Sequence, residues 1–438
     1  MQIVREPTQA IPESSLKGKT LLLPFILICT LFFLWAFLHN INGILIPHLK
    51  KVCQLSDTQS SLIDFAVYFG YFVIAIPAGL FSHRFGYKKG ILFGLFLFAL
   101  GALLFFPAAS ERNFIFFLVA LFVAASGATF LETVANPYAA VMGPPEHSEQ
   151  RLNFAQSFNG LGAVVAPLIG THFILSGIEH SPAELDAMKA HGELGAYLQQ
   201  EANSLKMPYL IIAGVLVLVA VIFIFTKLPE VTGSAADGHG SEFSFRVFRI
   251  PHVRWAVVAE FFYVGAQVGV TSFFVRFARY TAGIPEREAG GMLAKAMIGF
   301  MAGRFLGTFL MRYIKPARLL SLYAAINTGL LLIALSVHGV VAVYAMMAIP
   351  FFLSIMFPTI FALGIKDLGE ETKLASSFLV MSIIGGAFTP LMMGLISDRT
   401  GSIQVAYIMP VVCMLFILYF GLRGHRITTI QPAKPVVA

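Results

Sequence analysis

Charged side chains are scarce in this sequence of 438 residues. Asp, Glu, Lys and Arg together make up 12% of the chain, whereas hydrophobic residues make up 57%. A soluble domain carries about 25% charged residues, because its surface must be solvated. The scarcity of charge therefore excludes a soluble globular protein and predicts a polytopic membrane protein. At roughly 20–25 residues per span, the chain has room for about twelve transmembrane helices.

Cysteine is also rare, with three residues in the chain. Cys29 and Cys413 lie in apolar runs and Cys53 in a short loop, so they show neither metal-ligand spacing nor a disulfide framework. We find no nucleophile–base pair, no set of metal ligands and no phosphate-binding loop, and the sequence therefore predicts no enzyme, no metal site and no bound cofactor. The net charge of +7 comes from basic residues scattered at the ends of apolar runs, which argues against a nucleic-acid partner.

Apolar runs separated by charges, glycine or proline predict an all-α membrane protein with twelve spans. The expected spans are 20–48, 58–82, 89–109, 113–141, 152–176, 207–228, 252–280, 288–312, 317–337, 339–364, 372–397 and 402–423. The long loop 177–206 is expected to form a short external helix.

The polar segment 229–251 divides the spans into two groups of six. It predicts a linker between an N-terminal bundle (20–228) and a C-terminal bundle (252–424), with tails at 1–19 and 425–438. If the N-terminus is inside, inner segments hold 19 Lys and Arg residues and outer segments hold nine. This imbalance predicts that both tails and the linker are cytoplasmic.

The two groups of spans resemble each other. Asn136-Pro137 is followed by an Arg-Leu-x-x-Ala-x-Ser-Phe string, and Phe357-Pro358 by Lys-Leu-Ala-Ser-Ser-Phe. Two further pairs match in the same order, at a shift of about 220–230 residues, which indicates two parallel six-helix repeats. This is the architecture of the major facilitator transporters; chance similarity between apolar helices is the alternative.

Polar residues interrupt several spans, and water is absent from the bilayer core. Such residues face the bundle interior or a wet cavity, and amides beside a tyrosine suit a neutral ligand rich in hydroxyl groups. Hydrogen bonding between helices is the alternative. The predicted substrate-binding residues are Asn40, Asn42, Glu132, Asn136, Gln156, Asn159, Tyr263, Gln267, Thr271 and Phe357.

Three acids within spans are candidates for cation coupling, namely Glu132, Asp64 and Glu260. A buried carboxylate is costly to keep ionised, so it can exchange protons near neutral pH. Glu132 is the leading carrier. Asp64 near the outer end of its span could instead be solvated, and Glu260 could instead form an ion pair on the cytoplasmic side.

The turn 79–89, which reads GLFSHRFGYKK, resembles the loop signature of the major facilitator superfamily. Its candidate gating residues are Gly79, His83, Arg84, Gly86 and Lys88. His83 stands where the signature has Asp, a residue that caps a neighbouring helix and latches the two halves. The resemblance therefore implies a weaker or pH-dependent latch.

Strings such as LFFLWAFLHNINGILIPHL, LETVANPYAAVMGP, RLNFAQSFNGLGA and RWAVVAEFFYVGAQ resemble the bacterial L-fucose:proton symporter family, which includes glucose and galactose permeases. The resemblance extends from the first span to the eleventh. It implies that Glu132 is the family's membrane glutamate, associated with sugar binding and coupling. It further implies that Asn40, Gln156 and Asn159 are pocket residues.

The sequence lacks the aspartate that is the family's principal proton carrier. The pattern N-x-N-D-I-L-x-P has Gly43 in place of its aspartate. Asp64 and Glu260 stand where the fucose carrier has glutamines, Thr271 replaces a tryptophan, and Phe357 replaces a tyrosine. The resemblance therefore implies neither specificity for fucose nor the proton route of the family in its usual form.

The sequence as a whole predicts a monomeric importer of a neutral hexose or deoxyhexose in the bacterial cytoplasmic membrane. It would work by alternating access with the proton as the coupling ion, and sodium is the first alternative. Uncoupled facilitation is the further alternative, because the family's aspartate is Gly43. A sugar sensor is disfavoured, since neither the linker nor the tails could hold a long soluble domain.

Overall fold

The computed structural model describes residues 19–55, 57–174, 182–228 and 245–427, and within these ranges it is helical. Ten of the described helices, or runs of consecutive helices, are long and apolar enough to cross a membrane. Helices α1 and α6 occupy the remaining two expected spans. The predicted tails and most of the predicted linker lie outside the described residues.

The N-terminal half consists of α1 to α9 and includes two short helices outside the expected spans. Its helices are α1 (Lys19–Asn40), α2 (Asn42–Val52), α3 (Asp57–Phe85), α4 (Tyr87–Glu111), α5 (Phe114–Val141), α6 (Ser148–Ile174), α7 (Pro182–Ala190), α8 (Leu194–Asn203) and α9 (Lys206–Phe225). The loop expected to carry one external helix therefore carries two, α7 and α8.

The C-terminal half consists of α10 to α18, and several of its spans are divided. Its helices are α10 (Pro251–Ala282), α11 (Glu286–Leu310), α12 (Pro316–Ser336), α13 (Val340–Leu353), α14 (Met356–Gly364), α15 (Thr372–Met381), α16 (Gly385–Thr400), α17 (Ile403–Ala406) and α18 (Ile408–Tyr419). The short 3-10 helix η5 (Ser382–Ile384) separates α15 from α16.

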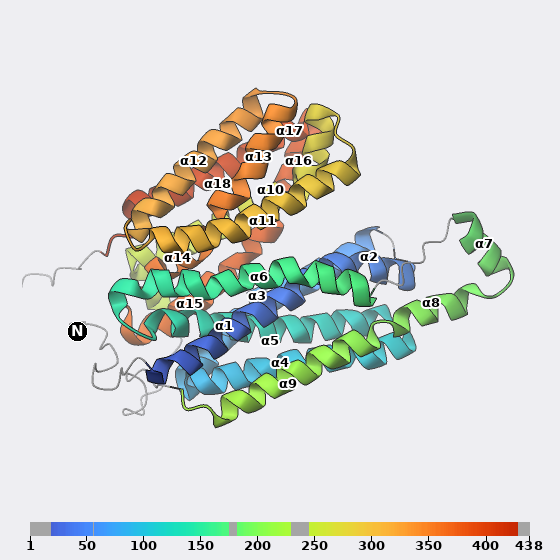
Figure 1. Cartoon of the computed structure of the whole chain (residues 1–438), viewed down its shortest axis with the longest axis horizontal. Coiled ribbons are helices and arrows are strands. Elements are labelled where there is room, and N and C mark those ends of the chain that lie inside the picture. Colours follow the sequence, from blue (N-terminus) through green and yellow to red (C-terminus); the bar gives the residue numbers. More distant parts are fainter. Residues whose placement is uncertain (1–18, 56, 175–181, 229–244, 428–438) are drawn as a thin grey trace, which may run out of the picture.

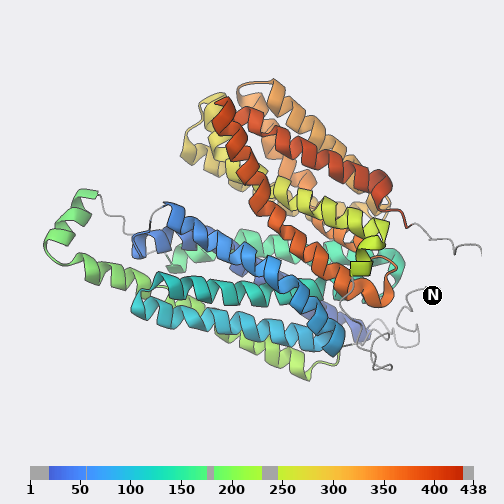
Figure 2. The same ribbon diagram turned by 180° about the vertical axis from the view of Figure 1, so that it is seen from behind.

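Figure 1 shows the two halves side by side, meeting near α14 and α15 and diverging toward α2 and α17. The view from behind shows the same arrangement (Figure 2). Contacts between the halves involve α3, α5 and α6 on one side and α11, α14 and α15 on the other. We call the end at which α14 and α15 contact the N-terminal half the closed end.

Helix α5 is capped at its start and packs closely against α4 within the N-terminal half. It begins after Asn113, whose Oδ1 accepts hydrogen bonds from the backbone N–H groups of Ile115 and Phe116, and this cap satisfies donors that a helix start leaves free. A Cβ at Gly127 would overlap the backbone of Phe98 in α4. Glycine therefore permits the close packing of α4 and α5 that small residues allow in membranes.

The expected tenth span is broken between α13 and α14, and proline explains the position of the break. Pro358 has no N–H group to donate to the carbonyl of Ser354, four residues earlier. An unpaired carbonyl inside a bilayer needs another donor. Arg304 of α11 supplies it, since its Nε donates to the Ser354 oxygen at 2.8 Å.

Candidate functional site

Glu132 lies on α5 where that helix is most deeply enclosed. Its side chain is 7% exposed, and every residue from 125 to 140 is buried. Tyr71 of α3 hydrogen-bonds the Glu132 carboxylate. Since a carboxylate accepts and a phenol O–H donates, Tyr71 favours the ionised form of Glu132.

Asn136 and Gln156 bridge α5 to α6. The Nδ2 of Asn136 donates to the backbone oxygen of Glu132 at 2.9 Å, one turn earlier in α5. The Nε2 of Gln156 donates to Oδ1 of Asn136, also at 2.9 Å. Both amides are buried. These bonds use one donor of each amide and one acceptor of Asn136, and the bond between the two side chains holds α5 and α6 together.

Arg304 connects the two halves. It is 3% exposed, and besides the Ser354 carbonyl it contacts two residues of α6. Its Nη1 donates to the backbone oxygen of Gln156 at 2.6 Å and lies 3.5 Å from Oδ1 of Asn159. The guanidinium therefore ties α11 and α13 to the helix that also carries Gln156.

Glu260 and Tyr263 of α10 face this region from the C-terminal half. Glu260 is fully buried and Tyr263 is 1% exposed. Neither carboxylate oxygen of Glu260 has a hydrogen-bond partner among the described residues, whereas the Tyr263 hydroxyl interacts with Arg304. Glu260 lies close enough to Glu132 for the two charges to interact.

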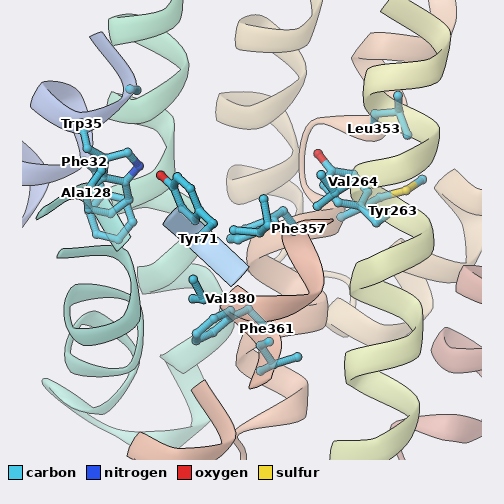
Figure 3. Close-up of a cluster of buried hydrophobic side chains, with 14 of the residues drawn as sticks. Phe32, Trp35, Tyr71, Ala128, Tyr263, Val264, Leu353, Phe357, Phe361 and Val380 are labelled. Atoms are coloured by element: carbon cyan, nitrogen blue, oxygen red, sulfur yellow. The ribbon is translucent and has the colours of Figure 1, made fainter. Parts of the chain in front are cut away.

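Apolar side chains close the space around these acids. Figure 3 shows Tyr71 of the N-terminal half facing Phe357 of α14, with Trp35 behind Tyr71. The Phe357 ring lies 6.1 Å from that of Tyr263 and is 8% exposed. Tyr71 also lines a pocket inside the N-terminal half, together with Trp35 and His39.

The remaining predicted binding residues do not all gather at this point. Gln267 and Thr271 lie on α10, but a rise of 1.5 Å per residue places them about 10 Å and 16 Å along the axis from Glu260. The Thr271 hydroxyl donates to the Gln267 carbonyl at 3.0 Å. Asn40 ends α1, and its Nδ2 donates to the Ala36 carbonyl at 2.7 Å. The side chains of Asn42 and Asp64 lie outside the described set.

The expected turn 79–89 is mostly helical: Gly79, His83 and Arg84 lie in α3 and Lys88 in α4, and only Gly86 lies between the two helices. A Cβ at Gly79 would overlap the Ser377 hydroxyl of α15 and approach the Lys373 carbonyl to 3.1 Å, so this glycine permits a close contact between the halves. Gly86 precedes α4 with a positive φ of 86°, a conformation that favours glycine.

The other loop residues behave differently from one another. Lys88 donates to the carbonyls of Ile224 and Thr226 at 2.9 Å, so it caps the end of α9 within its own half. Arg84 is exposed and lies over the Phe85 ring, 5.4 Å from its centroid. His83 is half-buried in the last turn of α3.

Two polar contacts between the halves were not expected from the sequence. Lys366, which follows α14, pairs with Glu149 of α6 at 2.8 Å. Nearby, Asn153 of α6 donates to the Thr359 hydroxyl of α14 at 3.1 Å. Both contacts join α6 to the α14 region at the closed end.

Tyr71 and Arg304 are the site residues that sequence reasoning left out. Arg304 carried a signal, because it is a charge deep within a span, and Pro358 leaves a carbonyl free for it. Tyr71 carried no signal of its own, since an aromatic residue in an apolar helix is ordinary. Only its contact with Glu132 distinguishes it.

Comparisons with known proteins agree with this architecture. A sequence profile of the Major Facilitator Superfamily matches residues 26–383. The L-fucose-proton symporter of Escherichia coli (strain K12) is 41% identical over 418 residues, covering 94% of this chain and 95% of that protein. The glucose/galactose transporter of Brucella abortus (biovar 1, strain 9-941) is 40% identical over 402 residues, covering 90% and 92%.

Solved structures show the same fold. The crystal structure of the transporter FucP in the outward conformation matches with a TM-score of 0.86 and 42% identity, covering 92% of this chain and 99% of that one. A bacterial homologue of the iron transporter ferroportin matches with a TM-score of 0.67 at 11% identity, which shows the fold alone. These matches confirm the predicted twelve-helix fold, and the transporters among the relatives confirm that the chain is not an enzyme.

Proposed function

The chain belongs to the Major Facilitator Superfamily, and we propose that it imports a neutral hexose or deoxyhexose together with a proton, by alternating access. The observation that carries the proposal is the facing of two buried acids, Glu132 and Glu260, from opposite halves of the molecule. Intramembrane acids in such positions mark ion and substrate pathways. The names of the fucose and glucose/galactose carriers among the relatives support the sugar class.

The sugar binds between the halves. Glu132 accepts a hydrogen bond from a sugar hydroxyl, and Gln156, Asn159 and Gln267 offer amide donors and acceptors. Aromatic rings such as Phe357 cover the apolar face of the ring. Within the part of the chain that the structure describes, Arg304 is the cation that contacts this region, and its donors are taken by protein groups. This agrees with a neutral substrate better than with a phosphorylated one.

Because the closed end is formed, the structure represents a conformation in which one side of the membrane has no access to the site. We assign the closed end to the cytoplasm, because the basic residues of the gating loop and of the segment around Lys366 are expected inside. The protein then faces outward here, works as a monomer in the bacterial cytoplasmic membrane with both termini inside, and needs no bound cofactor besides the co-transported proton.

Uptake into proteoliposomes tests the proposal. Purified protein is first screened by thermal shift against a panel of neutral monosaccharides, and the sugar that stabilises it is used for uptake. With one proton per sugar, a gradient of one pH unit, worth about 1.4 kcal/mol, should sustain a tenfold accumulation.

Three conditions separate the coupling alternatives. Uptake is measured with an imposed pH gradient, with an imposed sodium gradient and with neither. Accumulation under the sodium gradient alone would show that sodium, and not the proton, is the coupling ion. Equal uptake in all three conditions would indicate uncoupled facilitation, which the presence of Gly43 makes the relevant alternative.

A further inference from the structure

Among the described residues, Glu260 contacts neither a cation nor a hydrogen-bond donor. Both of its oxygens are buried and unpartnered among the described residues. An ionised carboxylate in such a place costs several kcal/mol even after the protein relaxes. The neutral acid avoids most of this cost, so the environment of Glu260 selects the protonated form.

Glu132 differs from Glu260 in its surroundings. It receives a hydrogen bond from Tyr71, which supports a carboxylate, and it retains 7% exposure. Two nearby acids cannot both ionise at low cost, and the one with the better donor keeps the charge. Burial opposes ionisation of both acids, but Tyr71 offsets part of that cost at Glu132 only. Of the two, Glu132 therefore gives up its proton more readily in this conformation, and Glu260 is the one that keeps it.

The helices packed on α10 bring no compensating cation to Glu260 within the described part of the chain. Arg304 of α11 acts on Tyr263, and Lys373 of α15 lies over the Tyr87 ring, 4.7 Å from its centroid. In α16, Asp398 and Arg399 lie about 20 Å along the axis from Gly385, whose Cα packs on the Phe261 backbone.

Other titratable groups on these helices also point elsewhere. Cys413 of α18 interacts with Thr389, and Tyr419 packs against Trp255. Behind Tyr71, the His39 ring of α1 lies 6.4 Å from the Tyr71 ring and so faces Glu132 only through that tyrosine. The charge that acts on Glu260 is that of Glu132.

We propose that Glu132 and Glu260 form a carboxylate pair that holds one proton across the interface between the halves, with Glu260 as the carrier of the transported proton and Glu132 as the sugar acceptor. The pair supplies the ionisable carboxylate that is missing at Gly43. When the closed end opens, water reaches Glu260, and the proton leaves to the inner solution with the sugar. The empty carrier then returns to the outward-open conformation, in which Glu260 takes up the next proton from outside. This assignment rests on the proposed function.

Infrared spectroscopy of the purified protein tests the proton directly and needs no substrate. The wild type at neutral pH should show the C=O band of a protonated carboxyl group. E260Q should lose that band, whereas E132Q and D64N should keep it. A wild type without the band, or an E260Q variant that keeps it, would overturn the proposal.

Transport by the same variants tests the role of the proton. E260Q should fail to accumulate sugar, so that the tenfold ratio per pH unit falls to one. Glutamine is nearly isosteric with the protonated acid, so the variant should fold. Accumulation that survives in E260Q and fails in D64N would overturn the assignment while leaving proton-coupled sugar import intact.

A buried acid elsewhere in the chain serves as the matched control. Glu201 of α8 is 4% exposed and pairs with Lys51 at 3.3 Å, away from the interface between the halves. E201Q should keep both the infrared band and sugar accumulation. A loss of accumulation in E201Q equal to that in E260Q would show a general effect of removing a buried acid, and would overturn the specific role of Glu260.

Discussion

At the scale of single residues, the environment of each polar side chain decides its chemistry. Glu132 and Glu260 are both acids within apolar spans, yet one accepts a hydrogen bond from Tyr71 and the other has unpartnered oxygens among the described residues. The same side chain is thereby suited to hold a charge in one place and a proton in the other. The sequence predicted both acids as coupling candidates, with Glu132 as the leading proton carrier, whereas the assignment proposed above gives the proton to Glu260.

Replacing Glu132 by glutamine should weaken sugar binding. A hydrogen bond to a charged acceptor contributes about 1.5–3 kcal/mol, so E132Q should raise the dissociation constant of the sugar by roughly 10-fold to 100-fold. Titration calorimetry on the sugar found by thermal shift measures the change. A dissociation constant equal to that of the wild type would show that Glu132 does not contact the sugar.

The amides illustrate what residue types alone leave open. Asn136 and Gln156 were predicted to bind substrate, with helix-to-helix bonding as the alternative. In the structure they bond each other at 2.9 Å, while Asn159 lies 3.5 Å from Arg304. Substrate binding by these residues stays a prediction, and it would use the acceptors and donors that these contacts leave free.

At the scale of helices, close approach depends on the absence of a side chain. The loop signature predicted Gly79 as a gating residue, and this glycine lies against Ser377 of α15. The expectation for His83, a pH-dependent latch in place of the signature's aspartate, is a separate prediction that this contact does not test.

Alanine at Gly79 should force α3 and α15 apart. The added Cβ would collide with Ser377, and overpacking of this kind costs about 1–3 kcal/mol. G79A should therefore melt at a lower temperature than the wild type in thermal unfolding of the purified protein.

The matched control for G79A is G214A in α9, where an added Cβ meets no atom within 4 Å. Glycine-to-alanine changes at open helical positions stabilise by about 0.4–1 kcal/mol. If G79A melts at or above the temperature of G214A, the close contact between α3 and α15 does not limit this conformation.

At the scale of the whole molecule, polar contacts between the halves gather at the closed end. The Lys366–Glu149 pair joins segments from opposite halves at 2.8 Å. Such a pair stabilises the conformation in which it exists and must break when that end opens. Because the Lys366 side chain is 33% exposed, solvent screens the attraction, and the pair contributes about 1 kcal/mol or less.

Charge reversal at Lys366 should favour opening of the closed end. Loss of the pair alone should shift the equilibrium by a factor of up to about five, and the repulsion from Glu149 adds to this shift. The measurement is the rate of thiol labelling of a cysteine at Thr359, which is fully buried here, after the native cysteines are replaced. K366E should raise that rate, and K366E with E149K should restore it; equal rates in the single and double variants would contradict a role for the pair.

The sequence by itself determined that this is a twelve-span facilitator with polar residues inside its helices. Backbone groups in a bilayer must be satisfied internally, so long apolar runs have no choice but to be helical. Likewise, the cost of placing an acid within such a run predicts a functional role for that acid.

Only the tertiary structure decided which residues act on one another. Glu132 and Glu260 belong to spans four and seven, and no local pattern specifies that they face each other across the interface. Packing of side chains from distant segments sets that relation, as it sets the contact of Tyr71 with Glu132 and the reach of Arg304 to Ser354. The proton and sugar roles proposed for the acid pair follow from those contacts, because the cost of a buried charge depends on its neighbours.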